Sequence, residues 1–246
     1  MTILTIDAGN TRIKWGLFDD AGTLIEHSAF PHNDLANVRF PNAERVIISN
    51  VAGDVMAIQL AKLLENFPLV QWLTAKHSAL GVTNSYTTPN KLGTDRWAAL
   101  IAAWHLEKTA CLVANAGTAV TIDALDTKGT FIGGMILPGL ELMRRNLHTA
   151  TAQLPFDPIT ATQLPAMFAI ETEQAMFSGA LHAVCGAINQ AAIALQETSG
   201  VVPAILLSGG NAQLISQGLT TVSHVTKRVV IVDNLVLEGL FLLATN

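Results

Sequence analysis

The alternation of apolar and polar residues predicts two series of secondary-structure elements in the same order. Each series opens with three short strands and continues with helices that alternate with strands. In the first half the predicted strands are 2–6, 12–18, 23–30, 45–49 and 69–73, and the helices are 55–66 and 95–107. In the second half the strands are 111–114, 119–125, 130–137, 204–207 and 228–232, and the helices are 140–147, 171–198, 212–217 and 235–244. Residues 83–90 are predicted to form a polar loop.

A short repeated segment at the start of each half indicates duplication. The segment IDAGNT at 6–11 resembles ANAGTA at 114–119, and each ends one predicted strand and turns into the next. We therefore expect an α/β protein of two duplicated lobes, each a mixed sheet flanked by helices. The first lobe would comprise residues 1–108 and the second residues 109–246.

Composition excludes several classes of protein. The chain has 246 residues, enough for two modest cores, and its 50% hydrophobic content is incompatible with disorder. The longest uncharged runs, 174–196 and 198–226, are interrupted by polar residues, so we expect no membrane span. The formal net charge of -5 argues against nucleic-acid binding. The N-terminus lacks the pattern of a signal peptide, and we expect a cytoplasmic protein.

The positions of the cysteine and histidine residues do not indicate a metal-binding site. Cys111 and Cys185 lie in apolar stretches without a second nearby cysteine, so both are expected to be buried thiols. The seven histidines show no spacing typical of a metal site.

Glycine turns join the first two predicted strands of each half, at Gly9 and at Gly117. Such a turn presents backbone N–H groups without bulky side chains, as a phosphate site requires. Asp7, beside the first turn, supplies an oxygen ligand of the kind that Mg²⁺ prefers. Either turn alone would also suit an ordinary hairpin, but matched turns in repeated halves favour a nucleotide site. The sequence contains neither a Walker A loop nor a G-x-G-x-x-G motif.

Asp95 is the second carboxylate with candidate chemistry, because it stands where a polar loop meets an apolar helix. One interpretation is structural: Thr94 or Asp95 caps the helix, and the acidic charge is stabilised at the helix N-terminus. The other is functional: Asp95 accepts a proton from a substrate hydroxyl, and Arg96 binds an anionic group of the substrate.

Five motifs in order along the chain resemble those of the type III pantothenate kinases. They are Asp7-Ala8-Gly9-Asn10-Thr11, Tyr86 with Leu92-Gly93-Thr94-Asp95-Arg96, Gly117-Thr118-Ala119-Val120-Thr121-Ile122-Asp123, Gly133-Gly134-Met135-Ile136-Leu137-Pro138-Gly139, and Leu207-Ser208-Gly209-Gly210-Asn211-Ala212. Each motif is weak alone, but together they cover nearly the whole chain. The resemblance implies the ribonuclease H-like, actin-like ATPase fold, a homodimer, and phosphorylation of pantothenate by ATP as the first step of coenzyme A synthesis.

The resemblance also implies roles for particular residues. ATP phosphates and Mg²⁺ would be bound by Asp7, Ala8, Gly9, Asn10, Thr11, Arg12, Ile13, Lys14 and Thr118. Pantothenate would be bound by Tyr86, Gly93, Thr94, Asp95, Arg96 and Thr172, with Thr172 acting across the dimer interface. Asp95 would be the catalytic base, and the segment 207–212 would lie on the adenosine side.

One position departs from the family pattern. The family usually has an aspartate where this chain has Asn115, and that aspartate is a ligand for an activating monovalent cation, K⁺ or NH₄⁺. An amide oxygen contributes no charge, so we predict weak or absent K⁺ dependence. Asp123 could compensate from the same hairpin, or it could have a structural role.

Two other functions stay open on the sequence alone. A different small-molecule kinase of the same superfamily would share both glycine turns but not the combination of Tyr86 with Gly93–Arg96. A non-catalytic regulatory or accessory factor on the same fold is compatible with Asn115, although the presence of Asp7 and Asp95 argues against it.

Overall fold

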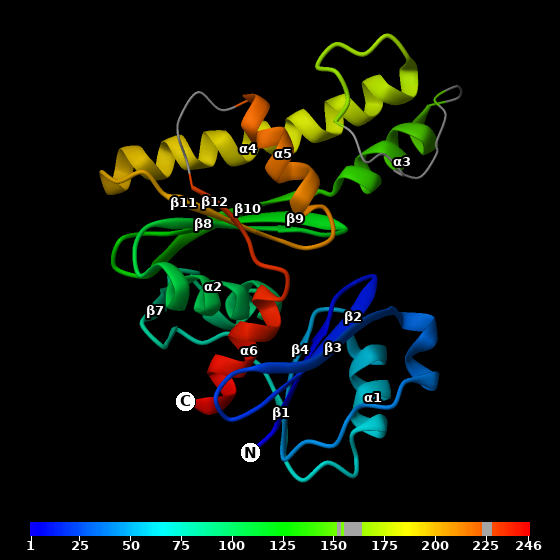
Figure 1. The fold of residues 1–246 in the computed structure, drawn as a ribbon, viewed down its shortest axis with the longest axis vertical. Helices are drawn as coiled ribbons and strands as arrows, with labels where there is room; N and C mark the ends of the chain where they lie inside the picture. Colours follow the sequence, from blue (N-terminus) through cyan, green and yellow to red (C-terminus); the bar gives the residue numbers. More distant parts are fainter. Residues whose placement is uncertain (152–153, 155–163, 223–227) are drawn as a thin grey trace. The chain divides into compact units, whose positions relative to one another are not determined.

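The computed structural model describes residues 1–151, 154, 164–222 and 228–246, and shows a mixed α/β chain that divides into two compact units (Figure 1). Unit 1 comprises Met1–Lys108, Gly129–Phe131 and Asn234–Asn246, and unit 2 comprises Thr109–Lys128 and Ile132–Asp233. The end of the uncharged run predicted at 198–226 lies outside the described residues.

A five-stranded sheet forms the centre of unit 1. Its strands are β1 (Ile3–Ala8), β2 (Arg12–Phe18), β3 (Leu24–Pro31), β4 (Arg45–Asn50) and β5 (Val70–Trp72), in the spatial order β3-β2-β1-β4-β5. The first three strands are antiparallel, whereas β4 and β5 run parallel to β1. All five agree with the sequence prediction to within two residues at each end.

The two faces of this sheet have different partners. Leu4, Ile6 and Ala8 of β1 belong to an apolar cluster that includes Met56 and Leu60 of helix α1 (Asp54–Leu63). Because side chains alternate along a strand, Thr5 and Asp7 lie on the opposite face. Helices α2 (Thr94–Glu107) and α6 (Leu235–Thr245) contact that opposite side of the sheet. A polar residue near the end of β1 thus faces the helices, not the α1 core.

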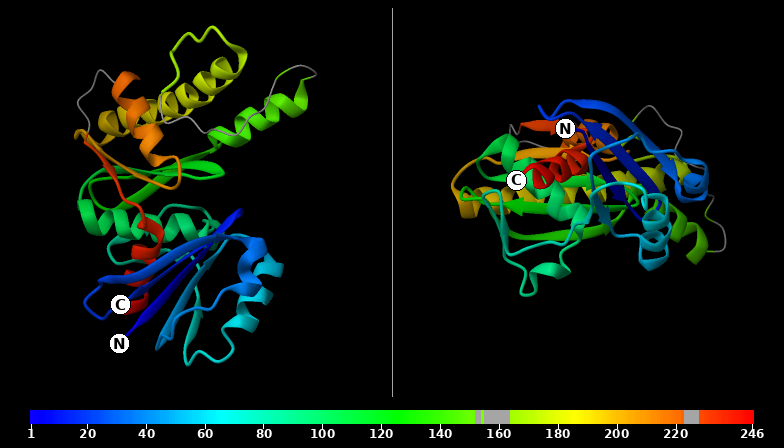
Figure 2. Two further views of the ribbon diagram at one scale, coloured as in Figure 1. Left: turned by 45° about the vertical axis from the view of Figure 1, so that its right-hand side comes forward. Right: turned by 90° about the horizontal axis from the view of Figure 1, so that it is seen from below.

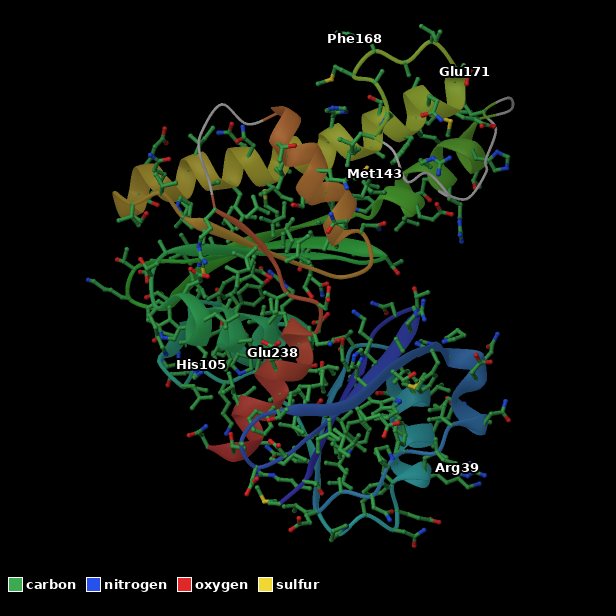
Figure 3. All side chains as sticks on the ribbon, viewed as in Figure 1. Arg39, His105, Met143, Phe168, Glu171 and Glu238 are labelled. Carbon is green, nitrogen blue, oxygen red and sulfur yellow. The ribbon has the colours of Figure 1, made fainter. Side chains whose placement is uncertain are left out.

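The C-terminal helix α6 belongs to unit 1, although the sequence analysis grouped it with residues 109–246. It packs on α2 and β1, and Figure 2 shows it in red beside α2 in both views. Gly239 permits this packing because any Cβ there would collide with the backbone of Ala98. Figure 3 shows His105 of α2 and Glu238 of α6 near each other; burial raises the pKa of Glu238, and the charge of His105 opposes that rise.

Two very short strands and two 3₁₀ helices complete unit 1. β6 (Ser78–Ala79) and β7 (Val82–Asn84) form a hairpin, and β7 pairs in parallel with Thr130 and Phe131, the first residues of β10 (Thr130–Pro138). The 3₁₀ helices η1 (His32–Asn37) and η2 (Pro89–Lys91) precede β4 and α2. The sequence pattern predicted none of these four elements, and β7 enters a segment that was expected to be a loop.

Unit 2 is built on strands in the order β12-β11-β8-β9-β10, where β8 is Cys111–Ala116, β9 is Ala119–Leu125, β11 is Ala204–Ser208 and β12 is Val229–Ile231. β8 pairs antiparallel with β9 and parallel with β11, and β11 pairs parallel with β12. Helices α3 (Leu140–Ala150), α4 (Thr172–Ser199) and α5 (Ala212–Val222) complete the unit. This order repeats that of unit 1, with β8 in the position of β1 and β11 in the position of β4.

Helix α4 is the longest element of unit 2 and packs on its sheet. By length and apolar composition it could cross a membrane, which the sequence analysis did not expect. Its residues Leu181, Val184 and Ile188 are buried in one cluster with Leu112 and Ile205 of the sheet. This packing is that of a core helix. Cys111 and Cys185 are both buried thiols that form no disulfide with the described residues, in agreement with the prediction of buried thiols.

Candidate active site

Three polar side chains lie side by side on adjacent strands of the unit 1 sheet, near the carboxyl ends of β1 and β4. The register pairs Asp7 of β1 with Lys14 of β2 and with Ser49 of β4. Directly paired residues of neighbouring strands point to the same face, so all three side chains project toward the helices. Asp7 and Ser49 are buried, with 8% and 0% of their surfaces exposed.

Asp7 has an unusual protonation equilibrium. Burial, followed by the negative charge of Asp95, raises its pKa from 3.8 to about 7, and Lys14 and a hydrogen bond from Ser49 oppose the rise. Its Oδ1 atom is buried and has no hydrogen-bond partner among the described residues. A buried, unpartnered carboxylate oxygen costs free energy unless a cation or donor binds it, so this atom suits a metal ligand.

The first glycine turn follows Asp7 directly and connects β1 to β2. The Gly9 N–H donates to the carbonyl oxygen of Arg12 at 3.2 Å, and His32 Nε2 lies 2.8 Å from the Gly9 carbonyl oxygen, which closes the turn from the other side. Asn10 and Thr11 at the tip of the turn are exposed. The turn is thus anchored at its base and open at its tip, as expected for a phosphate site.

The start of α2 brings the second carboxylate into the same unit. Gly93 is the N-cap residue, so neither Thr94 nor Asp95 caps the helix as the structural interpretation proposed. Asp95 Oδ1 accepts a hydrogen bond from the Arg96 N–H at 2.8 Å. Burial raises the pKa of Asp95, while that hydrogen bond and the charge of Arg96 oppose the rise. A Cβ on Gly93 would lie 2.7 Å from Asp95 Oδ1, so glycine is needed for this conformation.

Arg96 is held in place by aromatic side chains. Its Nη1 donates to the hydroxyl of Tyr86 at 2.9 Å, and its guanidinium carbon lies 5.7 Å from the ring centroids of both Tyr86 and Phe131. Asn84 is buried and accepts a hydrogen bond from the Tyr86 N–H at 3.0 Å. The two rings contact each other, with centroids 5.5 Å apart, and the guanidinium lies beside both. A cation that contacts two aromatic rings is stabilised and oriented, so Arg96 has a fixed direction before any substrate binds.

The second glycine turn, in unit 2, is enclosed by backbone. Its Gly117 N–H donates to the Ala119 carbonyl oxygen at 3.1 Å, and the Gly139 N–H donates to the Thr118 carbonyl oxygen at 2.8 Å. Gly139 is the N-cap residue of α3, so this turn is fixed to a helix N-terminus. Gly209 approaches Ala116 closely, with a φ of +94° that favours glycine.

Comparison with known proteins identifies the family. Residues 3–193 match the model of the type III pantothenate kinase family. The type III pantothenate kinase of Nitrosospira multiformis is 41% identical over 98% of this chain and 90% of its own. The chain belongs to the type III pantothenate kinase family.

Solved structures show the same fold at low sequence identity. A Campylobacter jejuni protein assigned to the Baf family of transcriptional activators superposes with a TM-score of 0.60 at 18% identity, covering 97% of this chain and 95% of its own. A Listeria monocytogenes protein assigned as an N-acetylmannosamine kinase gives 0.57 at 14% identity, covering 100% of both chains. These likenesses confirm the predicted actin-like, sugar-kinase fold of two lobes.

The residues that the pantothenate kinase resemblance assigned divide between the two units. Asp7–Lys14, Tyr86 and Gly93–Arg96 all lie in unit 1. Thr118 and Thr172 lie in unit 2, and both are exposed, with Thr172 in the first turn of α4. Asn115 is the penultimate residue of β8 and pairs with Thr121. Asp123 is 1% exposed and takes part in an interaction within the chain.

Four residues of this pantothenate kinase site were missed by the sequence analysis: Ser49, His32, Asn84 and Phe131. Ser49, His32 and Phe131 contact predicted site residues from segments distant in sequence, whereas Asn84 bonds to Tyr86 two residues away. Ser49 alone carried a usable signal, because it is a polar residue at the carboxyl end of an otherwise apolar strand, where parallel sheets place their sites. His32 and Phe131 depend on tertiary contacts that no local pattern encodes, and Asn84 lies in a segment that was expected to be a loop.

Proposed function

We propose that this protein transfers the γ-phosphate of ATP to the terminal hydroxyl of pantothenate, with Asp95 as the proton acceptor. The single observation that carries this assignment is the pair of carboxylates in unit 1, one buried and one partly buried. Asp7 stands beside a glycine turn, Asp95 lies in the first turn of an apolar helix, and the negative charge of Asp95 raises the pKa of Asp7. Membership of the pantothenate kinase family supports the substrate.

Asp7 would hold the Mg²⁺ that accompanies ATP. Its unpartnered Oδ1 supplies the hard oxygen ligand that Mg²⁺ requires, and bound Mg²⁺ neutralises charge on the phosphates. Gly9, Asn10 and Thr11 would offer backbone N–H groups to the phosphates, and Lys14 would add a positive charge. Thr118 would contribute in the same way from the second turn.

Asp95 would take the hydroxyl proton as the substrate oxygen attacks the γ-phosphorus. The oxygen–phosphorus bond forms, the bond between the γ-phosphorus and the bridging oxygen breaks, and ADP leaves with that electron pair. The raised pKa of Asp95 makes the carboxylate a stronger proton acceptor than an exposed aspartate.

Pantothenate would bind against the start of α2. Its carboxylate would pair with the oriented guanidinium of Arg96, and Tyr86, Gly93, Thr94 and Thr172 would line the rest of the site.

The proposal includes a cytoplasmic homodimer. Exposed apolar residues on β10, including Ile132, Met135 and Ile136, support a covered face in unit 2. Multi-angle light scattering of the purified protein tests the dimer.

The variant Asp95→Asn tests the catalytic role. We expect it to bind Mg-ATP and pantothenate with affinities near those of the wild type, because the amide keeps the shape of the side chain. Its kcat should fall by about 10²- to 10⁴-fold, the range of general-base catalysis. Isothermal titration calorimetry and a coupled ADP-release assay measure the two quantities.

Asp54→Asn is the matched control. Asp54 is also an acidic residue in the first turn of a unit 1 helix, but it is exposed and distant from the carboxylate pair in sequence. Loss of its helix-dipole interaction should leave turnover unchanged. A kcat for Asp95→Asn close to that of Asp54→Asn would rule out Asp95 as the base.

A further inference from the structure

Ser49 occupies a position between the two carboxylates that the proposed function does not use. It is the penultimate residue of β4, its surface is 0% exposed, and the parallel register places it directly beside Asp7. Its hydroxyl oxygen lies 2.9 Å from the hydroxyl of Thr94, the first residue of α2. A single buried hydroxyl therefore contacts both the strand that carries Asp7 and the helix that carries Asp95.

The direction of these hydrogen bonds follows from the chemistry of the groups. The register places Ser49 beside Asp7, and the Ser49 hydroxyl lowers the pKa of Asp7, so it acts as a donor toward the ionised carboxylate, which can only accept. Ser49 has one hydrogen to donate, so it must act as the acceptor toward Thr94. The result is a chain in which Thr94 donates to Ser49 and Ser49 donates to Asp7.

This chain distinguishes the two oxygens of Asp7. One oxygen accepts from Ser49, whereas Oδ1 is buried without a hydrogen-bond partner among the described residues. A carboxylate fixed by one neighbour cannot rotate freely to exchange its oxygens, so the unpartnered oxygen keeps one direction. Hydrogen-bonded partners of metal ligands commonly orient them in this way.

We propose that Ser49 is a positioning residue that fixes the Asp7 carboxylate so that Oδ1 faces the Mg²⁺ of the bound nucleotide. This inference rests on the proposed function, because it requires Asp7 to be the metal ligand. Through Thr94, Ser49 also ties the metal ligand to the start of α2. Ser49 acts only through Asp7 and Thr94 and contacts no reacting atom.

Unit 2 contains the same arrangement without the carboxylate. Ser208 ends β11, is 3% exposed, and pairs with Asn115 in the register that pairs Ser49 with Asp7. An amide beside the hydroxyl offers no anionic oxygen for Mg²⁺. We therefore assign the orienting role to Ser49 alone.

The variant Ser49→Ala tests the proposal by calorimetric titration of ADP over a series of Mg²⁺ concentrations. We expect the Mg²⁺ concentration for half-maximal ADP binding to rise about tenfold, the lower end for loss of a partner that orients a metal ligand. Affinity for ADP in EDTA should not change. Ser49→Thr keeps the hydroxyl and should restore most of the Mg²⁺ dependence.

Thr5→Val is the matched control. Thr5 is 0% exposed, lies on the same face of β1 as Asp7, and donates its hydroxyl to the Gly16 carbonyl oxygen at 3.1 Å, not to a carboxylate. Its loss should lower the melting temperature as Ser49→Ala does, without altering the Mg²⁺ titration. If Ser49→Ala is unfolded, Ser49→Cys replaces it, because a thiol keeps the volume and is a weak donor.

The outcomes separate the two proposals. A Mg²⁺ titration of Ser49→Ala that coincides with that of the wild type, with a stability loss like that of Thr5→Val, would show that Ser49 is only structural. The proposed function would then stand. A wild-type protein whose ADP binding does not depend on Mg²⁺, or that fails to phosphorylate pantothenate, would overturn the proposed function and this inference with it.

Discussion

The two glycine turns occupy the same place in their sheets but differ at every matched polar position except one. Asp7, Lys14 and Ser49 surround the first turn, whereas Asn115, Thr121 and Ser208 occupy the corresponding places at the second. The serine is common to both. The two oppositely charged residues of the first turn, Asp7 and Lys14, are replaced by two uncharged residues in the second.

The two turns also differ in how closely other backbone approaches them, and here the second turn is the more constrained. Gly139 and Gly209 approach the second turn so closely that a Cβ at either would collide with its carbonyl oxygens, whereas a Cβ at Gly9 in the first turn would meet only the Arg12 carbonyl oxygen at 3.3 Å. The tips of both turns are exposed. The first turn is therefore distinguished by its charged side chains, and the second by closely packed backbone.

Asp7→Asn should have the largest effect, because it makes the first turn resemble the second. We expect kcat/KM for pantothenate phosphorylation to fall by about 10³-fold or more, since the variant loses the charge that holds Mg²⁺. A spectrophotometric ADP-release assay at saturating Mg²⁺ measures this. Retention of more than about a tenth of the activity would contradict a metal-binding role for Asp7.

The same substitution should stabilise the fold at high pH. Folding raises the pKa of Asp7 to about 7, so the folded state holds a proton that the unfolded chain releases between pH 4 and 7. Wild-type stability therefore falls as pH rises through that range. Without Mg²⁺, Asp7→Asn should gain up to about 4 kcal/mol over the wild type at pH 8 and little at pH 4.

Urea unfolding in EDTA at pH 4, 6 and 8 measures this difference. A gain that is the same at all three pH values would show that the pKa of Asp7 is not raised in the folded protein. A gain that disappears when Mg²⁺ is added would support binding of the metal at Asp7.

Much of the fold followed from the sequence, because its elements are long enough to show a period. β1, β2 and β4 alternate or run apolar between turn residues, and α2 begins one residue before the predicted position. β6 and β7 have two and three residues, too few for any period. The assignment of α6 to unit 1 depends on which surface it packs against, which residue order does not specify.

The site divides in the same way between local and tertiary information. Asp7 and Asp95 could be proposed from the sequence, because each adjoins a turn or helix start with its own pattern. The effect of the Asp95 charge on the pKa of Asp7 and the link through Ser49 could not. Those depend on the register of β1 with β4 and on the packing of α2 against the sheet.

Gly139→Ala should have the next largest effect and should act on stability. A Cβ at Gly139 would collide with the Gly117 carbonyl oxygen and lie 2.7 Å from that of Thr118, so backbone must move. We expect a loss of about 2–4 kcal/mol in the free energy of unfolding, measured in urea. Gly9→Ala meets only the Arg12 carbonyl oxygen at 3.3 Å and should cost about 1 kcal/mol or less.

Gly179→Ala provides the control, because a Cβ there meets nothing within 4 Å and alanine favours a helix. It should be neutral or slightly stabilising. Equal losses for Gly139→Ala and Gly9→Ala would contradict the distinction between an enclosed second turn and an open first turn.

The response to K⁺ should be the smallest effect, because Asn115 removes the charge from the second turn. We expect K⁺ to raise the wild-type kcat by less than about twofold over Na⁺ at equal ionic strength. Asn115→Asp restores an anionic oxygen beside the enclosed turn and should increase that ratio. A large K⁺ stimulation of the wild type would show that charge at position 115 is unnecessary.

Asp123 is then the residue to replace, because it is buried on the partner strand of β8 and pairs with Val113, two residues from Asn115. If Asp123→Asn abolished such stimulation without lowering the melting temperature, the anionic ligand would have moved across the hairpin. A lowered melting temperature with an unchanged K⁺ ratio would instead assign Asp123 to the internal interaction that it makes in the folded chain.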